Sequence, residues 1–143
     1  MKNRNLLHSD NWITPDYIYN PLFNEFNFDF DPCPLNHDIT KWNGLNIEWK
    51  FSNFINPPYS IELKTKFIDK AVLEFKKGKT CVMLLPVSTS TKLFHEKILT
   101  NITEPIRFFK GRIKFIGYNT KGEFVNNKSP MHDSMLVIFK FKF

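Results

Sequence analysis

The feature that most restricts how this chain folds is a pair of adjacent prolines, Pro57 and Pro58, in the stretch FSNFINPPYSIELK at residues 51–64. A proline lacks the backbone N–H and has a fixed φ, so neither residue fits inside a helix or a sheet ladder. Pro58 also biases Pro57 toward extended backbone conformations. The chain must therefore form a stiff, extended turn here, with the amide of Asn56 at one end and the ring of Tyr59 at the other.

Strand and helix signals flank this turn on both sides. Residues 51–55 form a short apolar run that is typical of a buried strand. Across residues 61–77 apolar side chains recur at four-residue spacing, which predicts an amphipathic helix ended by Gly78. The continuous apolar run at residues 80–86 is typical of a central strand buried on both faces. The double proline therefore joins a strand to a helix, and a second strand follows.

The N-terminal region shows one helix signal and one strand signal. Thr14 and Pro15 predict a helix start, with Thr14 as the N-cap and Pro15 at the first helical position. We expect Pro21 to interrupt or end this helix, because it lacks the N–H that a helix interior requires. Aromatic and polar residues then alternate over residues 26–30, which predicts a strand that Pro32 stops.

The C-terminal half predicts one more helix, over residues 91–99, and several strands. The strand signals occur at residues 106–109, 112–118 and 135–141. Strands alternating with helices, followed by strands close together, predict an α/β fold whose mixed sheet has an antiparallel C-terminal edge. Ligands bind at the carboxyl ends of the strands in such sheets. Asp31 and Asn56 each follow a predicted strand, so we expect both side chains to face one crevice.

Composition favours one compact domain with a basic surface. The chain has 143 residues, 42% of them hydrophobic, which predicts a single domain with a substantial core. Its formal net charge is +6, and the basic surplus is concentrated in residues 104–143. Nucleic acid is the most common partner of such a surface. A solvated basic surface without a partner is the alternative.

Several classes of protein and site are not favoured. The apolar runs are too short to span a membrane, and the N-terminus lacks the apolar core of a secretory signal. Cys33 and Cys81 stand in no Cys-x-x-Cys or Cys/His ligand pattern, and the histidines show no metal-ligand spacing. We therefore expect a cytoplasmic protein with reduced thiols, no membrane segment and no metal site. No pattern in the sequence specifies an oligomeric state.

Six motifs occur in order along nearly the whole chain: DNWITP (10–15), FDFDPCP (28–34), FINPPYS (54–60), VMLLPVSTSTKLFH (82–95), FFKGRIKF (108–115) and SPMHDSMLVIF (129–139). This series resembles the phage-type DNA N6-adenine methyltransferases, a family of small Dam-like enzymes. The resemblance implies a compact Rossmann-like fold that uses S-adenosylmethionine as cofactor and DNA as substrate. It implies a single minimal methyltransferase domain over residues 1–143, with no separate target-recognition domain. It also implies a phage or prophage origin and a location in the cytoplasm of a bacterium or phage-infected host.

The motif Asn56-Pro57-Pro58-Tyr59 resembles the catalytic motif of amino methyltransferases, and its chemistry suits that role. The amino nitrogen of adenine is a poor nucleophile because its lone pair is delocalised into the ring. The Asn56 side-chain oxygen and the Pro57 carbonyl can accept its two N–H groups and free that lone pair. Pro58 helps to hold the carbonyl in a fixed direction, and Tyr59 can stack on a base flipped out of the duplex. The alternative is that the motif is only a rigid strand-to-helix turn.

The cofactor segment is expected around the sequence DPCP rather than a glycine-rich loop, because the chain has no GxG there. The resemblance implies that Asp31 and Pro32, with Thr14 and Pro15, hold the methionine portion of the cofactor. We expect Trp12, Cys33 and Asn56 to contact the cofactor as well. A carboxylate such as Asp31 suits the ammonium group of the cofactor. Trp12 or an apolar residue of 42–49 would stack on the adenosine ring. The alternatives are that Asp31 caps a turn and that Thr14 caps a helix.

The predicted DNA contacts follow the catalytic motif and the basic C-terminal region. They are Ser60, Lys110, Arg112 and Lys114. The three basic residues alternate along an expected strand, so we predict that they share one face and contact phosphates. A solvated strand edge, protected from aggregation by basic side chains, is the alternative.

Two other functions fit the same motif. One is an amino methyltransferase that acts on RNA or on a protein glutamine, although such enzymes typically carry a glycine-rich cofactor loop and extra domains. The other is a catalytically inactive relative that binds DNA. Because no segment is long enough to be a separate recognition domain, we predict relaxed or short-site specificity. Protection of a site with six or more fixed bases would contradict that prediction.

Overall fold

The computed structural model describes residues 12–34, 37–118, 124–126 and 132–141. Its main sheet has four strands in the order β2–β3–β7–β4, namely β2 (Ser52–Ile55), β3 (Thr80–Pro86), β7 (Ser134–Phe139) and β4 (Arg107–Phe108). β2 and β3 are parallel, whereas β7 runs antiparallel to both β3 and β4. The predicted α/β fold with a mixed sheet and an antiparallel edge is therefore confirmed.

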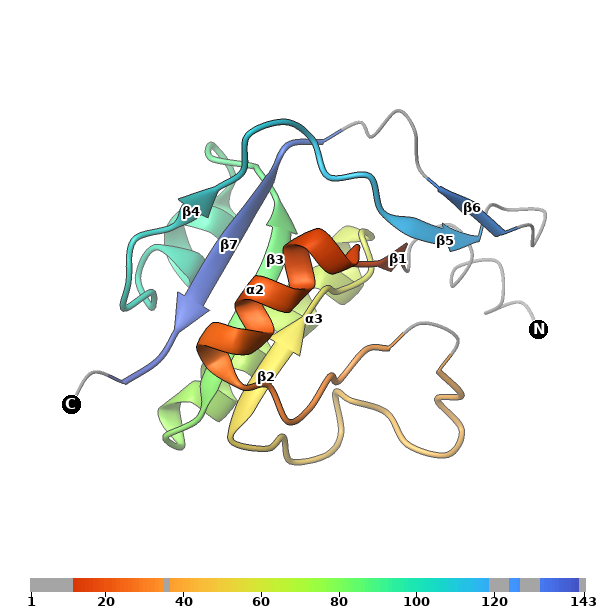
Figure 1. The fold of residues 1–143 in the computed structure, drawn as a ribbon. Coiled ribbons are helices and arrows are strands. Elements are labelled where there is room, and N and C mark those ends of the chain that lie inside the picture. Colours follow the sequence, from red (N-terminus) through yellow and green to blue (C-terminus); the bar gives the residue numbers. More distant parts are fainter. Residues whose placement is uncertain (1–11, 35–36, 119–123, 127–131, 142–143) are drawn as a thin grey trace.

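Helices cover both faces of this sheet (Figure 1). α2 (Asp16–Phe26) lies across one face, while α3 (Ile61–Lys76) and the short π-helical segment η1 (Leu93–Ile98) lie on the other. The amphipathic stripe predicted for residues 61–77 explains this placement of α3. Its side chains Phe67, Ala71 and Phe75 are all buried. Gly78 follows the helix with a φ of 102°, in agreement with its predicted role as the stop.

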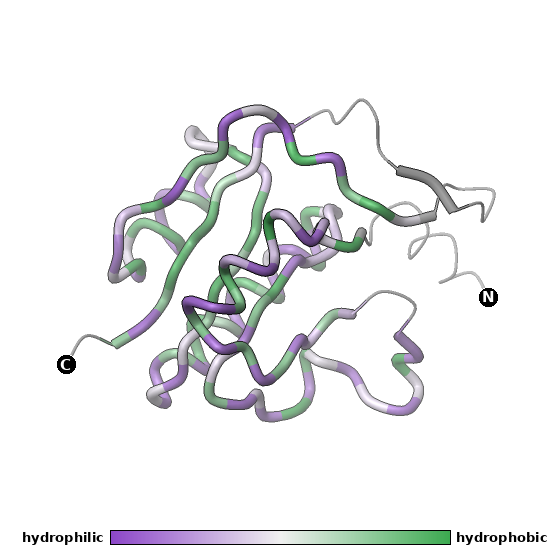
Figure 2. The backbone as a smooth tube through the Cα atoms, in the orientation of Figure 1, coloured by the Kyte–Doolittle hydropathy of each residue, from purple (hydrophilic) through white to green (hydrophobic). Residues whose placement is uncertain are grey.

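β3 is the central strand of the core. Cys81, Met83 and Leu85 pack with the α3 and η1 face, whereas Val82 and Leu84 pack with the α2 face. Side chains alternate along a strand, so a strand covered on both sides must be apolar throughout. Figure 2 shows hydrophobic residues along the central strands and hydrophilic residues mainly in the peripheral segments. The prediction of a doubly buried strand at residues 80–86 is confirmed.

Three short strands form a second, antiparallel sheet. Its order is β1–β5–β6, with β1 (Trp12–Ile13), β5 (Ile116–Tyr118) and β6 (Phe124–Asn126). The pairing of Ile13 with Ile116 attaches the segment before α2 to the C-terminal region. The sequence patterns predicted neither β1 nor β6, because strands of two or three residues are too short to show an alternation.

The N-terminal helix differs from its prediction at both ends. It begins at Asp16 with Pro15 as its N-cap, so the N-cap role of Thr14 and the helical position of Pro15 were wrong. The helix also continues through Pro21 to Phe26, although we expected Pro21 to interrupt or end it. Pro21 is exposed, as is Tyr17 one turn earlier, so water can satisfy the carbonyl that loses its helical partner.

Two predicted strands are shorter than expected. Residues 26–30 form only an isolated parallel bridge, between Phe30 and Asn53, because α2 includes Phe26 and Asn27 adopts a left-handed φ of 51°. The C-terminal strand expected at residues 112–118 is limited to β5. Lys110, Arg112 and Lys114 therefore lie outside the described strands, so their predicted strand positions were wrong. Exposed Arg112 and Lys114 nevertheless alternate with buried Ile113 and Phe115.

The other predicted elements agree more closely with the structure. The helix expected at residues 91–99 is present as η1. The Thr91 hydroxyl accepts the Phe94 N–H at 3.2 Å. The last strand signal corresponds to β7, which pairs with β3 over six residues.

Candidate active site at the carboxyl edge of the sheet

The segments that end with Phe30 and Ile55 leave the sheet at the same edge. Phe30 bridges Asn53 in the parallel sense, so Asp31 and Asn56 both follow segments that run in one direction. Both residues line a cavity of about 370 Å³, as the sequence led us to expect. The cavity is lined by Ile13, Thr14, Asp16, Tyr19, Asp31, Cys33, Pro34, Phe54 and Asn56.

Hydrogen bonds connect three of the sequence motifs around Asn56. The Asn56 side-chain Nδ2 donates to the Thr14 Oγ1 at 3.3 Å, and the residue is only 7% exposed. The Cys33 thiol donates to the backbone carbonyl of Asn56, with Sγ and O 3.3 Å apart. The contact with Thr14 restricts the orientation of the amide. The sequence predicted these three residues as neighbours of one ligand, but not their contacts with one another.

Asp31 combines a structural role with a place in the cavity. Its Oδ1 accepts the backbone N–H of Cys33 at 2.9 Å, so the alternative interpretation, that Asp31 caps a turn, is confirmed. Desolvation by the surrounding protein raises the pKa of its carboxyl to about 6, against the lowering effect of this hydrogen bond and of His37. Burial, and then Asp31 itself, raise the pKa of the phenol of Tyr19 and of the thiol of Cys33. Asp31 is therefore a carboxylate at neutral pH that a cationic ligand would stabilise.

Gly44 supports the Asp31–Pro34 turn from behind, a role that the sequence patterns did not reveal. A Cβ atom at this position would lie 2.0 Å from the backbone oxygen of Pro32. The Gly44 carbonyl also accepts the indole N–H of Trp49 at 2.7 Å. Close packing of two backbone segments therefore requires glycine here, although the residue does not have a positive φ.

We expect the Gly44→Ala variant to lose about 2 kcal/mol of the free energy of unfolding, because the added methyl must displace the Pro32 backbone. The same displacement moves Asp31, so cofactor affinity is expected to fall as well. Urea denaturation and calorimetric titration measure the two effects. The matched control is Asn46→Ala, an exposed position in the same loop. Equal stability of the two variants would contradict the packing role of Gly44.

Tyr59 lies at the other end of the Asn56–Tyr59 motif and contacts two aromatic residues. Its ring is edge-to-face with Phe115, with centroids 6.2 Å apart, and with His132, with centroids 6.1 Å apart. Burial raises the pKa of its phenol, so the side chain is neutral at physiological pH. Phe115 and His132 belong to two of the six motifs, but the sequence offered no reason to assign them to this site.

The remaining predicted site residues belong to the Asn56–Tyr59 motif, to the segments beside the cavity, and to β1 and the start of α3. Pro57 and Pro58 are buried between Asn56 and Tyr59, and Pro15 and Pro32 are buried beside the cavity. The backbone of Trp12 lies in β1. Ser60 occupies the N-cap position of α3 without a side-chain capping hydrogen bond.

The three basic residues predicted to contact DNA are all exposed. They are Lys110, Arg112 and Lys114. The Nε of Arg112 donates to Asp133 Oδ1 at 3.0 Å, and Asp133 lies beside His132 at the start of β7. Because His132 contacts Tyr59, Arg112 lies near the end of the Asn56–Tyr59 motif.

Within the described ranges, no group of three or more His, Cys, Asp or Glu side chains is arranged to hold a metal ion. None of the helices in that part of the chain has the length and apolar character needed to cross a bilayer.

The fold and the cavity together define an α/β protein with a ligand site at the carboxyl edge of its sheet, where two parallel segments contribute polar side chains. The chain matches the family model for DNA N-6-adenine-methyltransferase (Dam) over residues 3–142. Because the match covers nearly the whole chain, the protein belongs to the Dam family of DNA N-6-adenine methyltransferases, and the resemblance seen in its motifs is confirmed. The family implies DNA as substrate and S-adenosylmethionine as methyl donor. No curated protein and no solved structure matched the chain.

Proposed function

We propose that this enzyme methylates the N6 amino group of an adenine that has been flipped out of the DNA and is held by residues 56–59. The observation that carries the proposal is the shared cavity of Asn56 and Asp31, which brings the amino-group acceptor and a cation-binding carboxylate to one site. A catalytic amide must lie next to the methyl donor for direct transfer to occur. A turn that had only a structural role would not require this juxtaposition.

Asn56 and Pro57 prepare the adenine nitrogen for attack. Each accepts one N–H of the amino group, through the Asn56 Oδ1 and the Pro57 carbonyl, which draws the nitrogen toward a tetrahedral shape. The hydrogen bond from Asn56 Nδ2 to Thr14 holds the amide in one orientation before the base arrives. The burial of Pro57 and Pro58 restricts the carbonyl in the same way.

The cavity suits S-adenosylmethionine in size and charge. Its volume of about 370 Å³ lies within the range of small-molecule sites. Asp31 would hold the ammonium group, with the remaining contacts from Trp12, Thr14, Pro15, Pro32, Cys33 and Asn56. When bound, the cofactor supplies an electrophilic methyl group on its sulfonium. The chain's own residues therefore need only to orient the two reactants and exclude water.

Tyr59 would stack on the flipped adenine, and the exposed basic residues would hold the DNA backbone. Base–aromatic stacking contributes about 1–3 kcal/mol in other single-strand binding sites. Ser60, Lys110, Arg112 and Lys114 lie along the same edge and would contact phosphates. In this proposal residues 1–143 form a Rossmann-like catalytic domain.

The decisive experiment is the transfer of labelled methyl from S-adenosylmethionine to unmethylated DNA, with RNA and cell protein assayed in parallel. We expect the label to appear as N6-methyladenine in DNA. Label in RNA or protein would keep the amino-group chemistry but change the substrate. No transfer to any of the three, together with no cofactor binding, would support an inactive DNA-binding relative.

The pH dependence of cofactor binding tests the role of Asp31. Because its pKa is raised to about 6, the carboxylate becomes protonated as the pH falls through 6 rather than near 4. We expect the affinity for S-adenosylmethionine to be constant above pH 7 and to fall by up to about tenfold per pH unit below 6. Asp31→Asn should bind weakly at pH 8 and show little pH dependence in that range.

Calorimetric titration measures the affinities, and the control is Asp69→Asn. Asp69 is an exposed residue of α3 that forms an ion pair with Lys97. An Asp31→Asn variant with the wild-type pH profile would exclude Asp31 as the ammonium partner.

A further inference from the structure

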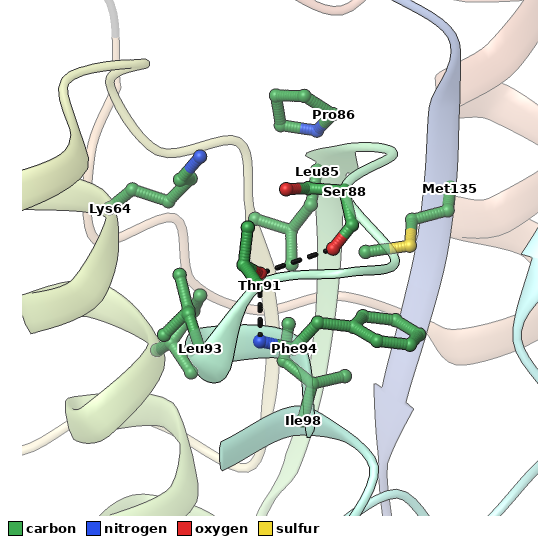
Figure 3. A pocket seen from close by; sticks show the side chains of 10 residues that line it. Lys64, Leu85, Pro86, Ser88, Thr91, Leu93, Phe94, Ile98 and Met135 are labelled. Carbon is green, nitrogen blue, oxygen red and sulfur yellow. Dashed lines mark hydrogen bonds between the residues drawn. The ribbon is translucent and has the colours of Figure 1, made fainter. Parts of the chain in front are cut away.

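Lys64 is a cationic side chain next to the catalytic motif that the proposed chemistry does not use. It lies in the first turn of α3 and lines a small cavity between α3, β3 and η1 (Figure 3). The other polar side chains of this cavity are Ser88 and Thr91, and the rest of its lining is apolar apart from backbone atoms. In Figure 3 the side chain of Lys64 extends from α3 toward the loop that carries Ser88.

This cavity lies at the same edge of the sheet as the active site, but on the other face. Leu85 and Ile68 line it, and both belong to the core under α3. The cavity that contains Asp31 is instead lined by Phe54 and Tyr19, which pack with the α2 face. The segment from Asn56 to Tyr59 leaves the sheet between the two cavities.

Ser88 and Lys64 lie at the same end of the sheet as that segment. Ile55 is paired with Met83 in the parallel ladder, so the chain leaves both strands at one edge. Ser88 follows two residues after the end of β3. Lys64 lies in the first turn of α3, which begins directly after residues 56–60, and it lines the same cavity as Ser88.

The ammonium group of Lys64 lacks a counter-ion within the described part of the chain. No hydrogen bond or ion pair joins its Nζ to another described residue. Burial lowers the pKa of this half-buried group, because a charge is disfavoured where water is partly excluded. The neighbouring Lys66 is different, since it is exposed and forms an ion pair with Glu62 at 3.4 Å. The Lys64 ammonium group is therefore available to pair with an anionic group of a bound ligand.

We propose that Lys64 and Ser88 bind a backbone phosphate of the DNA strand that carries the target adenine. The inference rests on the proposed function and adds a second contact region to it, on the opposite side of residues 56–59 from the cofactor cavity. A base held by residues 56–59 brings its own sugar-phosphate backbone to the surface beside the cavity that Lys64 and Ser88 line. A lysine provides a point charge for a phosphate, and a serine hydroxyl is a common second donor. Such a contact positions the nucleotide without reading its sequence.

The test compares the DNA affinity of Lys64→Ala, Lys64→Arg and Lys66→Ala with that of the wild type over a range of salt concentrations. Fluorescence anisotropy with one unmethylated duplex is the readout. We expect Lys64→Ala to weaken binding by about tenfold at low salt and to reduce the slope of log K against log salt by about 0.9, the value for one phosphate contact. Lys64→Arg should retain most of the affinity, and Lys66→Ala should change it less than twofold. The affinity for S-adenosylmethionine should be unchanged in all three.

Several results would overturn this inference. Equal affinity and salt slope for the Lys64→Ala and Lys66→Ala variants would exclude the phosphate contact. Loss of cofactor affinity with an unchanged salt slope would assign Lys64 to the cofactor instead. Thermal unfolding of each variant, with Lys64→Gln as a second substitution, identifies a loss of fold. Methyl transfer by the wild type is measured on the same duplex, so a failure of the proposed function is seen separately from a failure of the Lys64 contact.

Discussion

The Asn56→Ala variant is expected to lose methyl transfer by at least 10²–10³-fold while it keeps its fold. The substitution removes one of the two proposed acceptors for the adenine amino group, and the loss of one preorganised hydrogen-bonding partner of a transition state typically has this effect. The buried amide also contacts Thr14, so a stability loss of about 1 kcal/mol is expected in addition. Single-turnover transfer of labelled methyl separates the chemical effect from DNA binding.

Two variants control this experiment. Asn20→Ala, at an exposed position of α2, should transfer methyl at the wild-type rate. Thr14→Val removes the hydroxyl that accepts from Asn56 Nδ2 but leaves the Asn56 acceptor in place, so it should reduce transfer by about tenfold. An Asn56→Ala enzyme that retained more than a tenth of the wild-type rate would show that the amide is not the essential acceptor.

The largest effect on stability is expected at Glu74, a carboxylate far from the candidate site. It is completely buried in α3, where Lys70 donates to its Oε2 at 2.8 Å and Lys79 donates to its Oε1. The backbone N–H of Trp49 donates to the same carboxylate at 3.2 Å. Removing one member of a buried ion pair leaves the other charges without compensation. We therefore expect Glu74→Ala to lower the free energy of unfolding by about 3–5 kcal/mol.

The same carboxylate predicts how stability depends on pH. Burial alone would raise its pKa, but the hydrogen bonds from Lys70, Lys79 and Trp49 lower it to about 2, below its ordinary value of 4.5. A carboxyl whose pKa is lowered in the folded state stabilises that state above the unfolded pKa. This contribution is lost as the pH falls from about 4.5 through 2. The wild type should therefore lose stability over this range, and Glu74→Ala should lose less.

Urea denaturation at pH 7, 4.5 and 3 measures both effects. The matched control is Glu62→Ala on the same helix, because Glu62 is exposed and its pair with Lys66 is solvated. We expect that variant to lie within about 0.5 kcal/mol of the wild type. A Glu74→Ala variant as stable as the Glu62→Ala control would mean that the buried cluster contributes little to folding.

Long periodic segments were predicted from sequence with good accuracy. The helix at residues 61–77 and the strand at 80–86 were confirmed, because each shows its period over enough residues to exclude the alternative. The short elements were not predictable in this way. The alternation at residues 26–30 was interpreted as a strand, although in the structure a helix end and a turn bury Phe26 and Phe28 separately.

Proline and glycine show where local rules stop being sufficient. The rule that proline ends a helix failed at Pro21, because the affected carbonyl faces solvent there. The rule that glycine marks a positive φ would not have identified Gly44, which is required by a close contact with Pro32. Both outcomes depend on which atoms surround a residue, and that information is not local in the sequence.

The family, the strand–turn–helix unit around Asn56 and the crevice shared by Asp31 and Asn56 could all be predicted from the sequence. These conclusions follow from local backbone restrictions, periodicity and motifs, which depend on neighbouring residues. Three features required the packed structure: the contact between Thr14 and the Asn56 amide, the position of Phe115 and His132 beside Tyr59, and the cavity that Lys64 and Ser88 share. Each of these contacts joins segments that are distant in the chain. Their geometry depends on how the helices and strands pack, which no single stretch of sequence specifies.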